Sequence, residues 1–174
     1  MTHTPQIIVI EHEPKKHHSV QGTRLVHEYY GAIMAFAYSR APLKRLVDEK
    51  FLGEWKYLRK SFFEIPEQAA TRALIEPGLY IRIIDDDEGK LSSSLRKGDA
   101  YGEVERSDSS REPLTYREVT NKIIHAVNYR WNFPDGQPPS VTCIAAKNEG
   151  ARYDWVSATI VLSALGAICG GFMS

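Results

Sequence analysis

The sequence has few cysteines and lacks the common catalytic motifs. Its two cysteines, Cys143 and Cys169, lie too far apart to form a C-x-x-C pair, and two thiols cannot build a disulfide framework. We therefore expect both to be buried and reduced, as in a cytoplasmic protein. The chain has no phosphate-binding glycine loop, no G-x-S-x-G elbow and no H-E-x-x-H zinc motif. These absences weigh against nucleotide-binding, hydrolase and metalloprotease classes, and we expect no cofactor and no metal.

An excess of charge of either sign is also missing. Twenty-two Lys and Arg residues balance 22 Asp and Glu residues, so the formal net charge is zero. This balance argues against a nucleic-acid binder that works by bulk charge, although it leaves room for a local basic patch. Because little long-range repulsion opposes association, we expect a protein partner or a homodimer.

Charged residues are absent from Val156 to Ser174, a run almost long enough to span a bilayer. Gly166 and Gly170 even have the G-x-x-x-G spacing of packed membrane helices. However, hydroxyl residues and glycines dilute the run, and no Lys/Arg cluster flanks it. We favour a buried final strand and helix, and keep a C-terminal membrane anchor as an alternative. The first residues show no secretory signal, so we expect a cytoplasmic location.

The first half of the chain is predicted to be mainly helical. Apolar residues recur every three or four positions, which places them on one face of each helix. Pro42 suits the first turn of a helix, whereas Pro77-Gly78 is typical of a helix end. The pattern predicts helices over 20–39, 42–51 and 67–75, and strands over 6–11 and 79–84.

The second half is predicted to hold a short helix and a small sheet. Thr115 and Glu118 form the T-x-x-E capping box that begins a helix. Strands are predicted over 129–133, 141–147 and 153–159, and a final helix over 160–170. The polar stretch 85–112 resembles a flexible loop. The prediction is an α+β fold, one mainly helical domain over 1–174 with a small antiparallel sheet in its C-terminal half.

The predicted helix after Thr115 carries the most informative polar pattern. Arg117, Asn121 and His125 are four residues apart, so they form one ridge, opposite an apolar stripe that contains Val119 and Ile123. Arginine binds phosphate with paired hydrogen bonds, and histidine titrates near neutral pH. The ridge is therefore a candidate site for phosphate chemistry, and a solvated helix face is the alternative.

The run Asn121-Lys122-Ile123-Ile124-His125 resembles the helix motif of the HEPN superfamily, helical proteins that include many RNases. Asn121 and His125 match the family pattern Arg-Asn-x-x-x-His, whereas Thr120 stands where the family has arginine. The resemblance implies a metal-independent RNase in which His125 is the acid or base, Arg117 stabilises charge and Asn121 positions phosphate. Lys122 would contact RNA.

Other charged clusters are predicted to be solvated. The histidines and glutamates before Pro14 match no rigid metal motif, and Asp85 to Glu88 fails the calcium-loop template. A basic region with interleaved aromatic residues runs from Arg40 to Lys60, and its residues Arg59 and Lys60 are candidate RNA contacts.

The leading functional hypothesis is a non-catalytic binding or regulatory protein with a degenerate HEPN-like helix, acting through protein–protein contacts. An RNase that uses His125, Arg117 and Asn121 is the alternative, with RNA as its partner.

Overall fold

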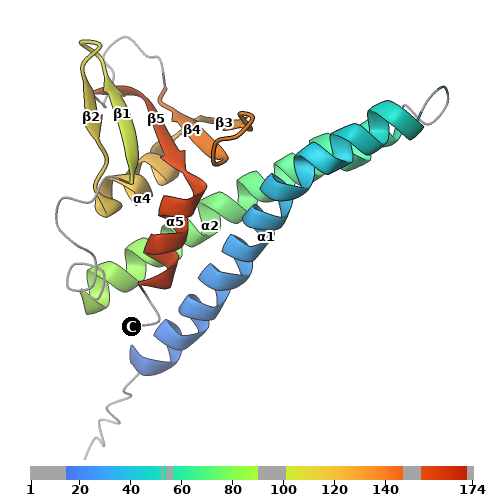
Figure 1. The fold of residues 1–174 in the computed structure, drawn as a ribbon. Helices are drawn as coiled ribbons and strands as arrows, with labels where there is room; N and C mark the ends of the chain where they lie inside the picture. The colour runs from blue at the N-terminus through green and yellow to red at the C-terminus, as the bar shows by residue number, and fades with distance from the viewer. Residues whose placement is uncertain (1–14, 52, 54–56, 90–100, 147–153, 172–174) are drawn as a thin grey trace, which may run out of the picture.

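The structure is a computed structural model that describes residues 15–51, 53, 57–89, 101–146 and 154–171, with the backbone alone for 15–20 and 88. It confirms the α+β class: two long helices come first and an antiparallel sheet follows (Figure 1). In chain order the elements are α1 (Lys15–Lys50), the π-helical turn η2 (Lys60–Glu64), α2 (Ile65–Glu88), β1 (Gly102–Arg106), β2 (Arg111–Pro113), α4 (Tyr116–His125), β3 (Asn128–Asn132), β4 (Ser140–Ile144), β5 (Trp155–Val161) and α5 (Leu162–Gly170).

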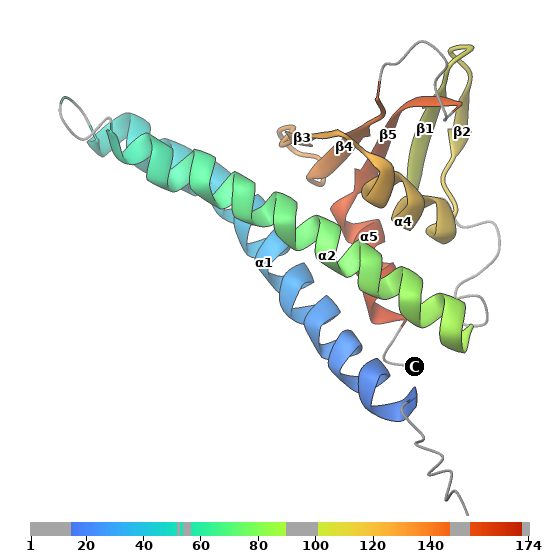
Figure 2. The same cartoon turned by 180° about the vertical axis from the view of Figure 1, so that it is seen from behind.

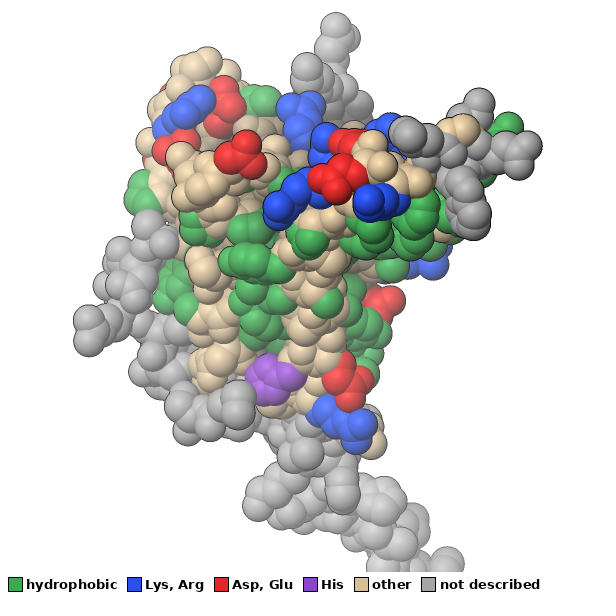
Figure 3. Space-filling view, turned by 45° about the vertical axis from the view of Figure 1, so that its right-hand side comes forward, with side chains coloured by type: hydrophobic (Ala, Val, Ile, Leu, Met, Phe, Trp, Pro, Cys, Tyr) green, Lys and Arg blue, Asp and Glu red, His purple; other side chains and the backbone are tan. Residues whose placement is uncertain are grey.

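Helices α1 and α2 form a long antiparallel hairpin, part of which extends beyond the sheet (Figures 1 and 2). α1 buries Val26, Ile33 and Val47, and α2 buries Leu74 and Ile81. Each helix has one such apolar face, and pairing these faces removes both from water. The space-filling view of one side of the molecule shows hydrophobic surface across its middle, with charged side chains gathered above and below (Figure 3).

The prediction of separate helices over 20–39 and 42–51 was wrong, because α1 runs through Pro42 without a break. Pro42 lies on the exposed side of α1, where water can replace the one backbone hydrogen bond that proline removes. The pairing with α2 therefore outweighs the local signal of the proline.

The predicted helix end at Pro77-Gly78 and the predicted strand over 79–84 were also wrong, because α2 continues to Glu88. Gly78 marks the point where α4 crosses α2: a Cβ added there would lie 2.9 Å from Cγ2 of Ile123. Ile81 and Ile84, three residues apart, are both buried on one helical face. Packing at helical spacing overrides the strand preference of these β-branched residues.

The sheet has five antiparallel strands in the order β2-β1-β5-β4-β3. Its inner face carries the buried side chains of the strands, among them Val104, Trp131, Val141 and Ile160. α4 packs between this side of the sheet and α2, as the two cartoon views show (Figures 1 and 2). The alternation of buried and exposed positions along β5 is the ordinary pattern of a strand with one covered face.

The sequence located β3, β4, β5 and α5 to within a few residues, but it missed the hairpin of β1 and β2. The stretch 85–112, predicted as a loop, holds the last turn of α2, all of β1 and the first two residues of β2. Only Val104 is buried among the five residues of β1, so the hydrophobic alternation that reveals a strand is almost absent. Residues 90–100 and the predicted strand over 6–11 lie outside the described residues.

The uncharged C-terminal run forms β5 and α5. Tyr30 on α1 donates a hydrogen bond to the carbonyl oxygen of Leu162 (3.2 Å), and Nε2 of His27 lies 3.0 Å from the carbonyl oxygen of Cys169. These contacts join α5 to α1, and they bury Leu165 and Ile168 in the core. Among the helices of the described residues, none is long and apolar enough to cross a membrane.

Candidate functional site

Helix α4, which carries the predicted ridge, begins as its sequence indicates. The Thr115 hydroxyl accepts a hydrogen bond from the Glu118 backbone N–H (3.4 Å), and the Thr115 backbone N–H donates one to the Glu118 carboxylate (3.0 Å). This reciprocal pair is the predicted capping box, and it satisfies two backbone donors at the start of the helix. The first turn of α4 is therefore fixed, and with it the direction of the residues that follow.

The ridge faces α2, where Arg117 and Asn121 make polar contacts. The Arg117 guanidinium lies 3.4 Å from an Asp85 carboxylate oxygen and 2.9 Å from one of Asp86. The Asn121 side-chain oxygen accepts a hydrogen bond of 2.8 Å from Arg82. Arg117 and Asn121 thus use their polar atoms to hold α4 against α2.

The acidic run at 85–88 is the last turn of α2, although the sequence predicted a solvated loop. The Asp85 side chain is only 4% exposed, and its Oδ1 has no hydrogen-bond donor among the described residues. Arg82 hydrogen-bonds Asp86 and, with Arg117, holds the pKa of the Asp86 carboxyl below its usual value. Carboxylates at a helix C-terminus face the negative end of the helix dipole, so these two arginines offset an unfavourable arrangement.

His125 is the last residue of α4, and its side chain is exposed. It lies eight residues after Arg117, which corresponds to about 12 Å along a helix axis. The three residues therefore lie in a row along α4, as predicted. Arg117 and Asn121 contact α2, whereas His125 lies at the exposed end of the helix.

Lys122, a candidate RNA contact, points to the other side of α4. Its side chain is buried, with Nζ 4.7 Å from the centre of the Trp155 ring. The loss of hydration, followed by the positive charge of Arg106, lowers the pKa of the Lys122 ammonium. This lysine therefore packs between α4 and β5 with its ammonium over an aromatic face, and burial disfavours its charged form.

Arg59 and Lys60, the other candidate RNA contacts, are exposed near the far end of the hairpin. Along the continuous helix they lie roughly 30 Å from Arg82, which contacts the ridge. The structure does not bring these two residues together with α4.

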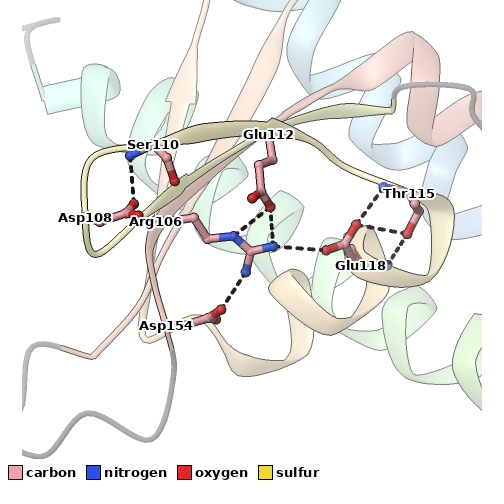
Figure 4. Close-up of polar contacts among 7 residues, drawn as sticks. All are labelled: Arg106, Asp108, Ser110, Glu112, Thr115, Glu118 and Asp154. Atoms are coloured by element: carbon pink, nitrogen blue, oxygen red, sulfur yellow. Dashed lines mark hydrogen bonds and ion pairs between the residues drawn. The ribbon is translucent and has the colours of Figure 1, made fainter.

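A charged cluster that the sequence did not predict surrounds Arg106 at the end of β1 (Figure 4). Its guanidinium contacts Glu112 on β2 at 2.6 Å, Asp154 before β5 at 3.0 Å and Glu118 on α4 at 3.6 Å. The hydrogen bond to Glu112 contributes most to raising the pKa of Arg106. Carboxylates from β2, from the capping box of α4 and from the segment before β5 thus contact one arginine.

The sequence does contain one local signal for this cluster, the turn between β1 and β2. Ser107 to Ser110 connects the strands, and the Asp108 carboxylate accepts a hydrogen bond from the Ser110 backbone N–H (2.9 Å). Ser109 has a positive φ of 68°. Aspartate and serine are typical turn residues, so this short run marks a hairpin even though its strands are mostly polar.

A second unpredicted cluster encloses Arg40 where the sheet meets the hairpin. Its guanidinium lies 4.8 Å from the ring centre of Phe63, 5.3 Å from Phe133 and 6.0 Å from Phe36. An ion pair of 3.4 Å with Glu67 completes the enclosure. Arg40 belonged to the basic region predicted to be solvated, but its charge is used to fasten the turn after β3 to the helices.

No group of His, Cys, Asp and Glu in the described part of the chain has the arrangement of a metal site. The side chains of His3, His12, His17 and His18 lie outside the described residues. Cys143 and Cys169 are buried, as predicted, and burial raises the pKa of each thiol to about 12. At neutral pH these thiols are protonated and unreactive.

The comparisons with known proteins leave the resemblance of α4 to the HEPN motif as a prediction: no family model, curated protein or solved structure matches this chain.

Proposed function

We propose that this chain is a non-catalytic binding or regulatory protein that acts through protein–protein contacts made by its helical hairpin. The observation that carries the proposal is the position of the exposed hydrophobic side chains. Eight large ones are exposed among the described residues, and six of these lie within 15–88: Tyr38, Leu46, Tyr57, Ile65, Leu79 and Ile83. These six lie on α1, on α2 and between the two helices, and an excess of exposed apolar side chains in one part of a protein is typical of an interaction surface.

The contacts of α4 support the same proposal. The positive charge that would attract a phosphate is already paired in Arg117, because its guanidinium contacts two carboxylates. The Asn121 oxygen is likewise engaged by Arg82. In this proposal the HEPN-like helix is a degenerate, structural element that joins the sheet to the hairpin.

An RNA cleavage assay separates this proposal from the RNase alternative. Purified protein and its His125→Ala variant are incubated with mixed RNAs in a metal-free buffer at neutral pH. We expect intact RNA in both reactions. Cleavage by the wild type that the variant has lost would overturn the proposal, because a metal-independent RNase needs a residue that transfers the proton.

A photo-crosslinking experiment tests the hairpin directly. Benzoylphenylalanine replaces Tyr57 or Ile83 in one set of cells and Gln137, exposed in the turn between β3 and β4, in the control. We expect discrete crosslinked protein bands from the two hairpin positions and none from Gln137. Equal crosslinking from all three positions would contradict a hairpin-specific surface.

A further inference from the structure

The side of α1 that faces away from its core carries residues at alternating spacings of four and three. Counted at 100° per residue, these positions lie opposite Ile33, which is fully buried. All are exposed. We call this row the outer seam; its residues are Arg24, Glu28, Gly31, Ala35, Tyr38, Pro42, Arg45 and Glu49. This is the a/d spacing with which one helix packs along another in a coiled coil.

The outer seam is uncharged in its middle and charged at both ends. Between Glu28 and Arg45 the seam holds only uncharged residues, including Tyr38, whose side chain is 58% exposed. An exposed helix of a monomer normally carries charge along its outer side, so the middle of the seam is suited to contact with protein.

The charges at one end of the seam are complementary to those at the other end, so two antiparallel copies of α1 would place opposite charges side by side. If a second α1 lies antiparallel, with a two-fold axis between residues 36 and 37, Arg24 lies opposite Glu49 of the second copy. Glu28 then lies opposite Arg45 of the second copy. Since a two-fold axis repeats each contact, four opposite-charge pairs flank the uncharged middle.

The sizes of the middle residues match in the same register. Gly31 lies opposite Pro42 of the second copy, and Ala35 lies opposite Tyr38. Small residues thus face bulky ones, as interdigitated helices require. A Cβ added to Gly31 would meet nothing within 4 Å in this chain, so the space beside it is open to a second molecule.

A parallel arrangement lacks both matches. In it each residue lies opposite its own copy, so Arg24 faces Arg24 and Glu28 faces Glu28, and like charges repel. Tyr38 would also face Tyr38, whereas Gly31 would face Gly31 and leave a gap. Charge and size both select the antiparallel pairing.

We propose that a second copy of this chain binds along the outer seam, forming an antiparallel, two-fold symmetric dimer through α1. This inference rests on the proposed function, in that it names one partner of the hairpin. The seam covers 26 residues, or about seven helical turns and roughly 38 Å. Arg24 and Glu28 already form an ion pair of 2.7 Å within α1, and the pairing extends it into a four-charge network at each end. The remaining exposed hydrophobic residues of the hairpin stay available to other proteins.

Light scattering and sedimentation of the full chain test the pairing by charge exchange. We expect a concentration-dependent dimer that Glu28→Arg or Arg45→Glu weakens, each raising the dissociation constant about tenfold because the two-fold axis doubles every lost contact. The double variant, Glu28→Arg with Arg45→Glu, restores opposite charges and should recover most of the affinity. Arg130→Glu, an equal charge reversal on β3, should leave the dissociation constant unchanged.

Matched tyrosine variants test the middle of the seam. Tyr38→Ala should weaken the dimer about tenfold or more, because an anchor opposite a small residue is lost. Tyr57→Ala removes a tyrosine that is even more exposed, at 74%, but lies outside the seam, and it should have no effect. Since both side chains are exposed, circular dichroism should show an unchanged fold for both variants.

Cysteine crosslinking tests the register. Gly31→Cys and Pro42→Cys, each alone, place equal residues roughly 16 Å apart along the axis and should form no disulfide dimer. A mixture of the two proteins should form one under mild oxidation. The native cysteines are buried and protonated, so they do not interfere.

Each contrary result is decisive. A wild type that stays monomeric up to about 100 µM would overturn the self-pairing. A dimer that is insensitive to Glu28→Arg, a double variant that fails to recover, or disulfides formed by each single variant alone would overturn it equally. A monomer without RNase activity would leave the proposed function intact, whereas RNA cleavage by a dimer would overturn that function but not the pairing.

Discussion

Arg117 on α4 compensates the charge of Asp85 on α2, a carboxylate that is almost fully buried. The two side chains come from segments that are 32 residues apart, and their ion pair of 3.4 Å ties the helical hairpin to the sheet. The residue that sequence reasoning assigned to catalysis therefore has a structural role that accounts for its presence.

Replacing Arg117 with alanine should leave Asp85 buried without a counter-charge. We expect Arg117→Ala to lower the free energy of unfolding by about 1–3 kcal/mol, measured by urea denaturation. Adding Asp85→Asn should recover part of the loss, because a neutral amide costs less to bury than a carboxylate. Arg130→Ala, at an exposed position on β3, should change the stability by less than about 0.5 kcal/mol. An equal effect of the two arginine variants would contradict the structural role of Arg117.

The carboxyl of Asp86 should make stability depend on acid. Its pKa in the folded chain lies below the ordinary 3.8, mainly because Arg82 hydrogen-bonds it. The stabilisation is therefore fully present above the unfolded pKa and is lost as the pH falls through the folded one. The difference in unfolding free energy between wild type and Asp86→Asn should stay constant above about pH 5 and shrink below about pH 4. A difference that does not change down to about pH 2 would argue against the pairing with Arg82.

Lys122 should make stability rise with pH in the alkaline range, because burial disfavours its charged form. Its pKa in the folded chain is lowered from 10.5, first by lost hydration and then by Arg106. As the pH rises from the folded pKa to 10.5, the unfolded chain still binds a proton that the folded chain has released, so stability rises. Relative to Lys122→Met, wild type should become more stable as the pH rises toward 10.5 in a series of denaturant titrations. A constant difference would mean that the ammonium is not desolvated.

Gly166 should be intolerant of a side chain. A Cβ at this position would collide with the hydroxyl oxygen of Tyr30, which α1 places against α5. We expect Gly166→Ala to destabilise the fold by about 1–3 kcal/mol, despite the better helix propensity of alanine. Gly31→Ala, where a Cβ meets nothing within 4 Å, should stabilise α1 by about 0.5–1 kcal/mol. Thermal denaturation at low protein concentration measures both changes.

The sequence predicted those elements whose signals are local. The capping box of Thr115 and Glu118 depends on residues three apart, and the strands β4 and β5 carry buried residues at alternate positions. These features need no knowledge of the rest of the chain. The α+β class followed from them, whereas the order of the strands in the sheet did not.

The sequence failed where distant packing decides. The continuity of α2 through Gly78 depends on Ile123 of α4, which lies against it. The ridge was expected to face solvent because one buried stripe was assumed, but α4 is covered on two sides. Neither Asp85 nor Arg40 shows in its own neighbourhood that a partner far along the chain will bury it.

The π-helical turn η2 sets the direction in which the residues before it point relative to those of α2. The helix from 58 to 88 is continuous, and this one wide turn lets the adjacent Phe62 and Phe63 point to different partners, Phe51 at the end of α1 and Arg40. Deleting a single residue such as Ser61 would return the turn to ordinary α-helical winding and rotate the segment before it by about 100° relative to α2. One aromatic contact would then be lost whichever way the tip settled. In homologous chains we therefore expect insertions and deletions within the hairpin to add or remove whole helical turns. Those of other lengths should lie outside Lys60–Glu64.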